Sequence, residues 1–335
     1  MPSKFIVNKL QSLLGSEHLV EAYLNKFGEI VNESYIEQIK NAAAAKKDAA
    51  PQANAPSSGD DPVYEMLVQC PACNREDIVS YNLRSKSQVI KETLFLVPQY
   101  SQMQKYFAVD FNLLQTTVCP DCLLASPDPR DWSQKSKFTG KITESQLNEH
   151  TRLLAEIRNQ EQARKTKIPD AKGNPTYFAR PRSLEKAIES IELSIMRAEA
   201  ESKYAVTATD FKLGSYYLKI ADIQKKQKKD NTETLKKAEQ YFSAAAVKSD
   251  IPSATLEMMS IYQVVALNLF LGNKTKAAEF LKITKDALRE REQRVKEEST
   301  SENKAELTEV QKWEKRISNL WEYRDDADYW KDADA

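Results

Sequence analysis

The sequence is poor in the residue types that build flexible loops, proton-transfer sites and membrane spans. Seven glycines in 335 residues are few, and with the abundant Ala, Lys, Glu and Gln they favour a mostly helical protein with short turns. Only two histidines occur, His18 and His150, and we interpret both as surface or packing residues, so acid–base catalysis has few candidates. No apolar run approaches the ~20 residues that cross a bilayer, so we expect no membrane span.

The chain also lacks net charge and the common catalytic motifs. Its 49 basic and 49 acidic residues cancel, so no overall field attracts nucleic acid or anionic lipid. It contains no glycine-rich phosphate loop, no H-E-x-x-H motif and no nucleophile elbow, and we therefore expect no enzyme activity. The N-terminus has no apolar signal core, which together with reduced cysteines predicts a cytoplasmic protein.

What the chain does contain is four cysteines in two matched pairs. The first pair is C-P-A-C, at Cys70 and Cys73, and the second is C-P-D-C, at Cys119 and Cys122. Two such turns can present four thiolates to one Zn2+ at Zn–S distances of about 2.3 Å. Four sulfur ligands leave no open coordination position, so the sequence predicts one structural, non-catalytic zinc ion per chain. We call each pair together with its two following residues a knuckle: the first spans 70–75 and the second 119–124.

Two other interpretations of the cysteines stay open. A redox C-x-x-C pair usually begins a helix in a thioredoxin-like unit, whereas each pair here ends an apolar stretch. Two disulfides would require an oxidising compartment. Zinc is the interpretation that the spacing favours.

The 45 residues between Cys73 and Cys119 are long enough to hold several strands. Apolar and β-branched runs predict strands in and around this interval, and a polar, aromatic segment predicts an excursion over the surface. The expected strands are Val63–Gln69, Ile78–Asn82, Gln88–Phe95 and Ala108–Val118, and the excursion is Pro98–Tyr106.

The run L-V-Q-C-P-A-C, the polar segment R-S-K-S-Q and the later C-P-D-C resemble the bacterial domain of unknown function 2225 family. The resemblance covers Val63 to Trp132 by motif. It implies a four-cysteine metal module followed by helices similar to tetratricopeptide repeats, and it implies no activity. Asn74 and Leu123 stand where such knuckles usually have Gly. Because Leu adopts the left-handed conformation at a cost, we expect the second knuckle to be distorted.

The fold class predicted for the whole chain is α+β, mostly α, with a small zinc-ribbon-like β module followed by an antiparallel array of helical hairpins. The expected divisions are a helical N-terminal module (1–41), a flexible linker (42–62), the zinc-ribbon-like module (63–140), a connecting helix and basic loop (141–182), a tetratricopeptide-like domain (183–324) and an acidic tail (325–335). The N-terminal helices either pack back on the body or offer a second contact point that docks on a partner or on a second copy of the chain. The tail is either a loose end or a short docking peptide.

Two helix pairs match part of the tetratricopeptide pattern. Leu213, Gly214 and Tyr217 fit its first helix, and Ala238 and Phe242 fit its second. The next matching alanine follows 39 residues later instead of 34. The helices are therefore degenerate repeats or a plain stack of helical hairpins.

These features predict an interaction or scaffold protein that binds a protein partner. Stacked helix pairs expose an inner groove, and we expect Lys212, Tyr216 and Lys219 to face it. The alternative is a zinc-ribbon protein that binds nucleic acid through 152–186, where basic residues outnumber acidic ones by nine to four. Its candidate contacts are Arg158, Arg164, Arg180 and Arg182. Against it, 63–140 has balanced charge, and four thiolates around Zn2+ add a formal charge of minus two that repels phosphate.

Overall fold

The computed structural model describes residues 59–103, 105–132, 144–204, 208–247 and 253–334. The predicted N-terminal module, most of the predicted linker and His18 lie outside these residues, so the structure leaves them as predictions. The described part belongs to one compact unit, Ser58–Ala335. None of its helices combines the length and the apolar character that crossing a membrane requires.

Three small antiparallel sheets of two strands each build the cysteine-containing part. Strand β1 (Val63–Val68) pairs with β2 (Ile78–Leu83), and the first knuckle connects them. Strand β5 (Thr117–Val118) pairs with β6 (Ala125–Ser126), and the second knuckle connects these. Each cysteine pair therefore lies at the turn of a β-hairpin. This position differs from the helix start expected for a thioredoxin-like redox pair.

The segment expected to be a surface excursion is a strand. β4 (Pro98–Gln102) pairs with β3 (Gln88–Glu92), and the tip between them inserts among the helices. The Tyr262 hydroxyl donates to the Leu94 carbonyl at 2.9 Å, and the Gln263 amide donates to the Phe95 carbonyl at 2.7 Å. The apolar residues at the tip gain burial by this insertion, which the interpretation of 98–106 as an excursion did not foresee.

The strand expected over Ala108–Val118 is mostly absent. A short 3-10 helix, η1 (Phe111–Leu113), takes its place, and only Thr117–Val118 is a strand. The Asp110 carboxylate accepts a hydrogen bond from the Asn112 amide at 3.2 Å. Such a cap favours a helical turn over extended backbone, and it outweighs the apolar composition of the segment.

Nine helices follow in the described part of the chain. They are α4 (Glu144–Asn159), α5 (Glu161–Lys167), α6 (Leu184–Ser202), α7 (Thr209–Lys226), α8 (Thr232–Val247), α9 (Ala254–Phe270), α10 (Lys274–Glu297), α11 (Ser301–Glu322) and α12 (Ala327–Asp334). The side chains of Ser183, Ser253 and Thr300 cap α6, α9 and α11. Two further 3-10 turns, η2 (Pro129–Asp131) and η3 (Pro169–Ala171), lie in the connections.

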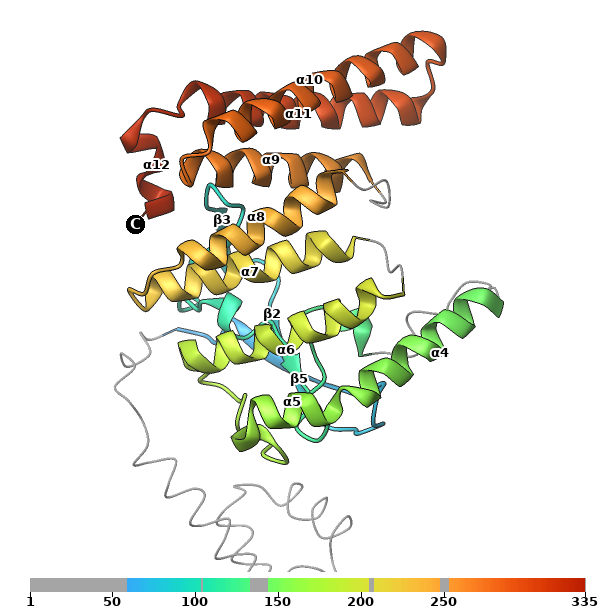
Figure 1. Ribbon diagram of the computed structural model, residues 1–335. Helices are drawn as coiled ribbons and strands as arrows, with labels where there is room; N and C mark the ends of the chain where they lie inside the picture. Colours follow the sequence, from blue (N-terminus) through green and yellow to red (C-terminus); the bar gives the residue numbers. More distant parts are fainter. Residues whose placement is uncertain (1–58, 104, 133–143, 205–207, 248–252, 335) are drawn as a thin grey trace, which may run out of the picture. The chain divides into compact units, whose positions relative to one another are not determined.

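The helices form an array in chain order. Figure 1 shows α6, α7, α8 and α9 following one another side by side, with α10 and α11 beyond α9, and each neighbouring pair is in contact. A Cβ atom on Gly214 would come within 2.9 Å of the Phe242 ring, so α7 and α8 pack closely at this glycine. Small sheets followed by a helical array confirm the predicted fold class, α+β and mostly α.

The acidic C-terminal segment is part of the core instead of a loose end. Its last eight described residues form α12, and the Trp330 side chain is buried in the same apolar cluster as α9. The Trp330 indole donates to the Tyr323 carbonyl at 3.0 Å. Burial of the aromatic side chain is favourable, while Asp325, Asp326 and Asp328, which precede it, stay at the surface.

Candidate metal centre

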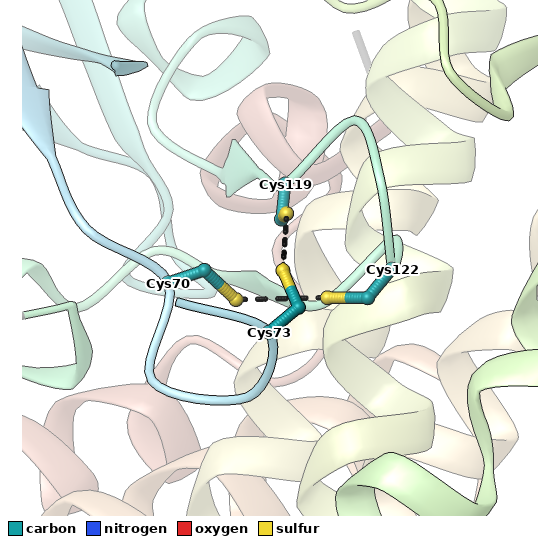
Figure 2. A group of neighbouring side chains, drawn as sticks. All are labelled: Cys70, Cys73, Cys119 and Cys122. Carbon is teal, nitrogen blue, oxygen red and sulfur yellow. Dashed lines mark hydrogen bonds between the residues drawn. The ribbon is translucent and has the colours of Figure 1, made fainter. Parts of the chain in front are cut away.

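The four cysteine sulfur atoms converge on one point. Figure 2 shows Cys70 facing Cys122 and Cys73 facing Cys119, with Sγ–Sγ distances of 3.6 and 3.5 Å. All four sulfurs lie within 4.8 Å of one another. A tetrahedron with Zn–S bonds of about 2.3 Å has sulfur atoms about 3.8 Å apart. The arrangement therefore suits a metal ion held by four sulfurs, and none of the four cysteines forms a disulfide.

The two knuckles have the same backbone geometry. The amide of Asn74 donates to the Cys70 carbonyl at 3.0 Å, and that of Leu123 donates to the Cys119 carbonyl at 2.9 Å. In each knuckle the first cysteine's amide also donates, at 2.8 Å, to the carbonyl five residues later. Both Asn74 and Leu123 are left-handed, with φ of 62° and 54°.

The prediction that Leu123 distorts the second knuckle is therefore wrong. Its left-handed conformation costs about 1–2 kcal/mol, but its side chain is fully buried against Ile168, Phe178 and Leu193. Burying a leucine contributes about 1.5–3 kcal/mol. This gain offsets the backbone cost, so the chain keeps the turn without glycine.

The surroundings of the two knuckles differ. Cys70, Cys119 and Cys122 are buried, whereas Cys73 is exposed. The buried sulfurs belong to an apolar cluster that includes Leu153 of α4. The same cluster contains Ala72 of the first knuckle and Leu124 of the second, so α4 packs against both knuckles.

Two arginines of the basic segment each bind one knuckle. Arg158 Nε donates to the Ala72 carbonyl at 2.8 Å, and Arg164 Nε donates to the Cys122 carbonyl at 2.9 Å. Sequence analysis missed this role. The available signal was the excess of basic residues at 152–186, interpreted above only as a nucleic-acid-binding segment.

The four thiols cannot all ionise without a cation between them. Hydrogen bonds with Cys122 and Cys70, followed by burial, raise the pKa of the Cys119 thiol. Hydrogen bonds from Cys119 and Cys70 lower the pKa of the Cys122 thiol. Sulfurs this close share protons, because one thiolate next to another is unfavourable. A divalent cation removes that repulsion, so metal binding and loss of the protons are linked.

The residues predicted to line a partner groove have contacts within the protein. Lys212 Nζ donates to Glu201 at 2.9 Å, and Lys219 Nζ donates to Gln115 at 2.5 Å. Tyr216 packs in the apolar cluster between α6 and α7. The open face expected there is occupied, because α6 and the segment before the second knuckle cover this side of α7. The spacing along one helix could not show that long-range contact.

The remaining arginines proposed for nucleic-acid binding also have protein partners. Arg180 pairs with Asp61 at 2.5 Å. Arg182 donates to the carbonyls of Phe178 and Thr116 at 2.7 and 2.8 Å. With Arg158 and Arg164, all four candidate side chains therefore make hydrogen bonds inside the protein. His150, interpreted above as a surface or packing residue, lies in α4, and its side chain is outside what the structure describes.

Comparison with known proteins agrees with the family resemblance of the two cysteine pairs. A search of curated proteins gave no match, and a search of solved structures gave none either. The model of the family described as "uncharacterized protein conserved in bacteria (DUF2225)" matches residues 63–307. The match includes both knuckles and the helices from α4 to α10. The chain therefore belongs to this bacterial family.

Proposed function

We propose that this chain is a non-enzymatic interaction protein whose fold depends on one structural Zn2+ ion. The ligands are Cys70, Cys73, Cys119 and Cys122. The observation that carries the proposal is the convergence of these four sulfurs within 4.8 Å from two separate β-hairpins. Tetrahedral sites of four thiolates favour zinc or an iron–sulfur cluster. The spacing of one tetrahedral ion favours zinc.

A structural ion suits the position of the site. The two hairpins are short, and β5 and β6 have only two residues each. Two-residue strands contribute little stability of their own, because an isolated hairpin is marginal in water. A four-sulfur site is also closed, so the metal holds the hairpins together and has no position for a substrate.

Strand β1 supports the proposed interaction with a protein partner. Its neighbour in the described part of the chain is β2, so its outer edge has no strand beside it. Leu67 is 65% exposed and lies directly opposite the exposed Val79. Tyr64 and Met66 on the same strand are exposed as well. Tyr64 and Met66 point to the opposite face of the sheet from Leu67, and exposed apolar side chains on an open edge strand are typical of protein–protein contacts.

We infer that the partner presents an extended segment that adds to the outer edge of β1. The backbone N–H and C=O groups of an open edge can pair with such a segment. Apolar side chains of that segment would cover Leu67 and Met66. The chemistry therefore specifies an apolar β-strand of another protein, instead of a charged ligand.

The test of the partner surface uses the full-length chain as bait. A double variant, Leu67→Ser with Val79→Ser, removes the apolar pair without touching the cysteines. The control, Ile283→Ser, removes an exposed apolar side chain on α10. We expect the double variant to lose a partner that wild type and control both retain, with unchanged melting temperature. Equal retention by all three chains contradicts the proposed surface, and zinc content measured on the same samples tests the metal separately.

A further inference from the structure

Arg164 is a fully buried cation without an acidic partner. Its side chain is 1% exposed, and it forms no ion pair with a carboxylate among the described residues. Nε donates to the Cys122 carbonyl at 2.9 Å and Nη1 donates to the Ile157 carbonyl at 2.8 Å. Nη2 has no hydrogen-bond partner in the described part of the chain. Carbonyl dipoles satisfy part of the guanidinium, but a buried charge also requires an opposite charge nearby.

The sulfur cluster supplies the opposite charge. Burial lowers the pKa of the Arg164 guanidinium, and the charge of Cys122 is the first influence that opposes this shift, followed by Glu161. Four thiolates with a divalent ion carry a formal charge of minus two. Because Arg164 of α5 donates to the Cys122 carbonyl, the cation lies beside a buried part of that anion.

A second buried arginine shows that burial alone does not explain this placement. Arg182 is 7% exposed and donates to the carbonyls of Phe178 and Thr116. Burial lowers its pKa to about 10, and the one opposing influence is Tyr81. Arg182 therefore has a comparable set of neutral acceptors without the sulfur cluster. It provides a natural control for Arg164.

We propose that Arg164 is the counter-charge of the metal–tetrathiolate complex and raises the affinity of the four cysteines for the metal. Arg164 is a positioning residue and not a ligand: it offsets the excess negative charge and holds the Cys122 carbonyl. The inference rests on the proposed structural metal ion. Arg158 binds the first knuckle in the same way, but it is exposed, and water screens its charge.

The experiment measures zinc affinity in the full-length protein by competition with a chromophoric chelator. Four chains are compared: wild type, Arg164→Met, Arg164→Lys and the control Arg182→Met. Substitutions of groups that support metal ligands weaken affinity by about 10- to 100-fold, and we expect that loss in Arg164→Met. Arg164→Lys keeps the charge and should bind zinc at least about tenfold more tightly than Arg164→Met.

The control separates a local charge effect from general destabilisation. Arg182→Met also removes a buried guanidinium, so its melting temperature should fall, but its zinc affinity should stay within about threefold of wild type, well below the loss expected at a ligand-supporting residue. If Arg164→Met and wild type bind zinc equally, the counter-charge proposal is wrong. The same conclusion follows if Arg182→Met loses as much affinity as Arg164→Met.

Two further outcomes are covered by the design. If Arg164→Met does not accumulate as folded protein, Arg164→Gln replaces it. The Arg164→Lys variant should then bind zinc about tenfold more tightly than the Arg164→Gln variant. Equal affinity of those two variants overturns the proposal. If wild type itself binds no metal, the structural-zinc proposal fails first, and the role of Arg164 fails with it.

Discussion

The two knuckles have the same backbone conformation, but their side chains differ in solvent exposure. In both, the residue after the second cysteine is left-handed, and the same two backbone hydrogen bonds close the turn. The first knuckle has an exposed cysteine and an exposed Asn74, whereas the second has two buried cysteines and the buried Leu123. The C-x2-C turn thus has the same backbone in both places, and the surroundings decide which side chain can occupy the left-handed position.

This difference indicates that the knuckles have different roles in stability. The second knuckle is part of the protein core: Arg164 binds the Cys122 carbonyl, and the Gly173 amide donates to the Pro120 carbonyl at 2.9 Å. The first knuckle contacts the body through Arg158 and through the buried side chains of Cys70 and Ala72, while Cys73 and Asn74 stay exposed. Equivalent substitutions should therefore cost more in the second knuckle than in the first.

The largest effect should come from removing the metal. Structural zinc contributes about 10–16 kcal/mol in small peptides, which matches or exceeds the about 5–15 kcal/mol stability of a typical domain. Cys122→Ser should therefore release the metal and unfold the cysteine module. Circular dichroism melting and metal analysis of the same sample measure both effects.

The same substitution in the first knuckle, Cys73→Ser, gives the comparison. It also removes a predicted ligand, but Cys73 is exposed, so this variant should keep more residual structure than Cys122→Ser. A Cys122→Ser protein that melts at the wild-type temperature would show that the fold does not depend on the metal.

The next largest difference should separate the two arginines. Arg164→Ala leaves two buried carbonyls without the guanidinium donors, at about 1–3 kcal/mol each, so we expect a loss of about 2–6 kcal/mol. Arg158→Ala should cost about 1 kcal/mol, because water can replace an exposed donor. Urea unfolding of the zinc-loaded proteins measures both values. Equal losses would mean that the second knuckle is no more a part of the core than the first.

A smaller contrast concerns the left-handed residues. Leu123→Gly relieves about 1–2 kcal/mol of backbone cost but removes a buried leucine worth about 2–5 kcal/mol, so it should destabilise the protein by about 1–3 kcal/mol. Asn74→Gly should change stability by less than about 1 kcal/mol. Thermal melts of the two variants measure both changes in stability. A stabilised Leu123→Gly protein would show that the backbone cost dominates.

The smallest effect should come from the ion pair between the knuckles. Arg75 and Asp121 meet at 2.6 Å, but both side chains are substantially exposed. Exposed ion pairs contribute about 0–1 kcal/mol, so Arg75→Ala should barely shift the urea midpoint. A loss comparable to that of Arg164→Ala would mean that this surface contact, and not the buried core, joins the knuckles.

Local chemistry in the sequence was sufficient to predict that the four cysteines come together and to predict the fold class. Two C-x2-C pairs define four ligands by spacing alone, and scarce glycine with helical apolar spacing indicates the array. These signals depend on residues close together in the chain. They can therefore be read without knowing which distant segments pack against them.

The missed features depend on contacts between distant residues. Pro98–Gln102 is a strand because the hairpin tip inserts beside α9, and Leu123 is tolerated because α6 and the 168–178 loop bury it. Lys219 is covered by Gln115, which lies 104 residues earlier. The charge count at 152–186 was correct, but composition cannot reveal the partners of its arginines: Arg158 and Arg164 bind backbone carbonyls of the knuckles, and Arg180 and Arg182 bind groups elsewhere in the protein.

The most direct test of the central claim is the metal content of freshly purified full-length protein. Elemental analysis and thiol titration should be performed on wild type and on Cys119→Ser. The account predicts one zinc per wild-type chain, thiols protected until a chelator is added, and no bound metal in Cys119→Ser. Metal-free wild-type protein, with four freely reactive thiols or with two disulfides, would contradict it.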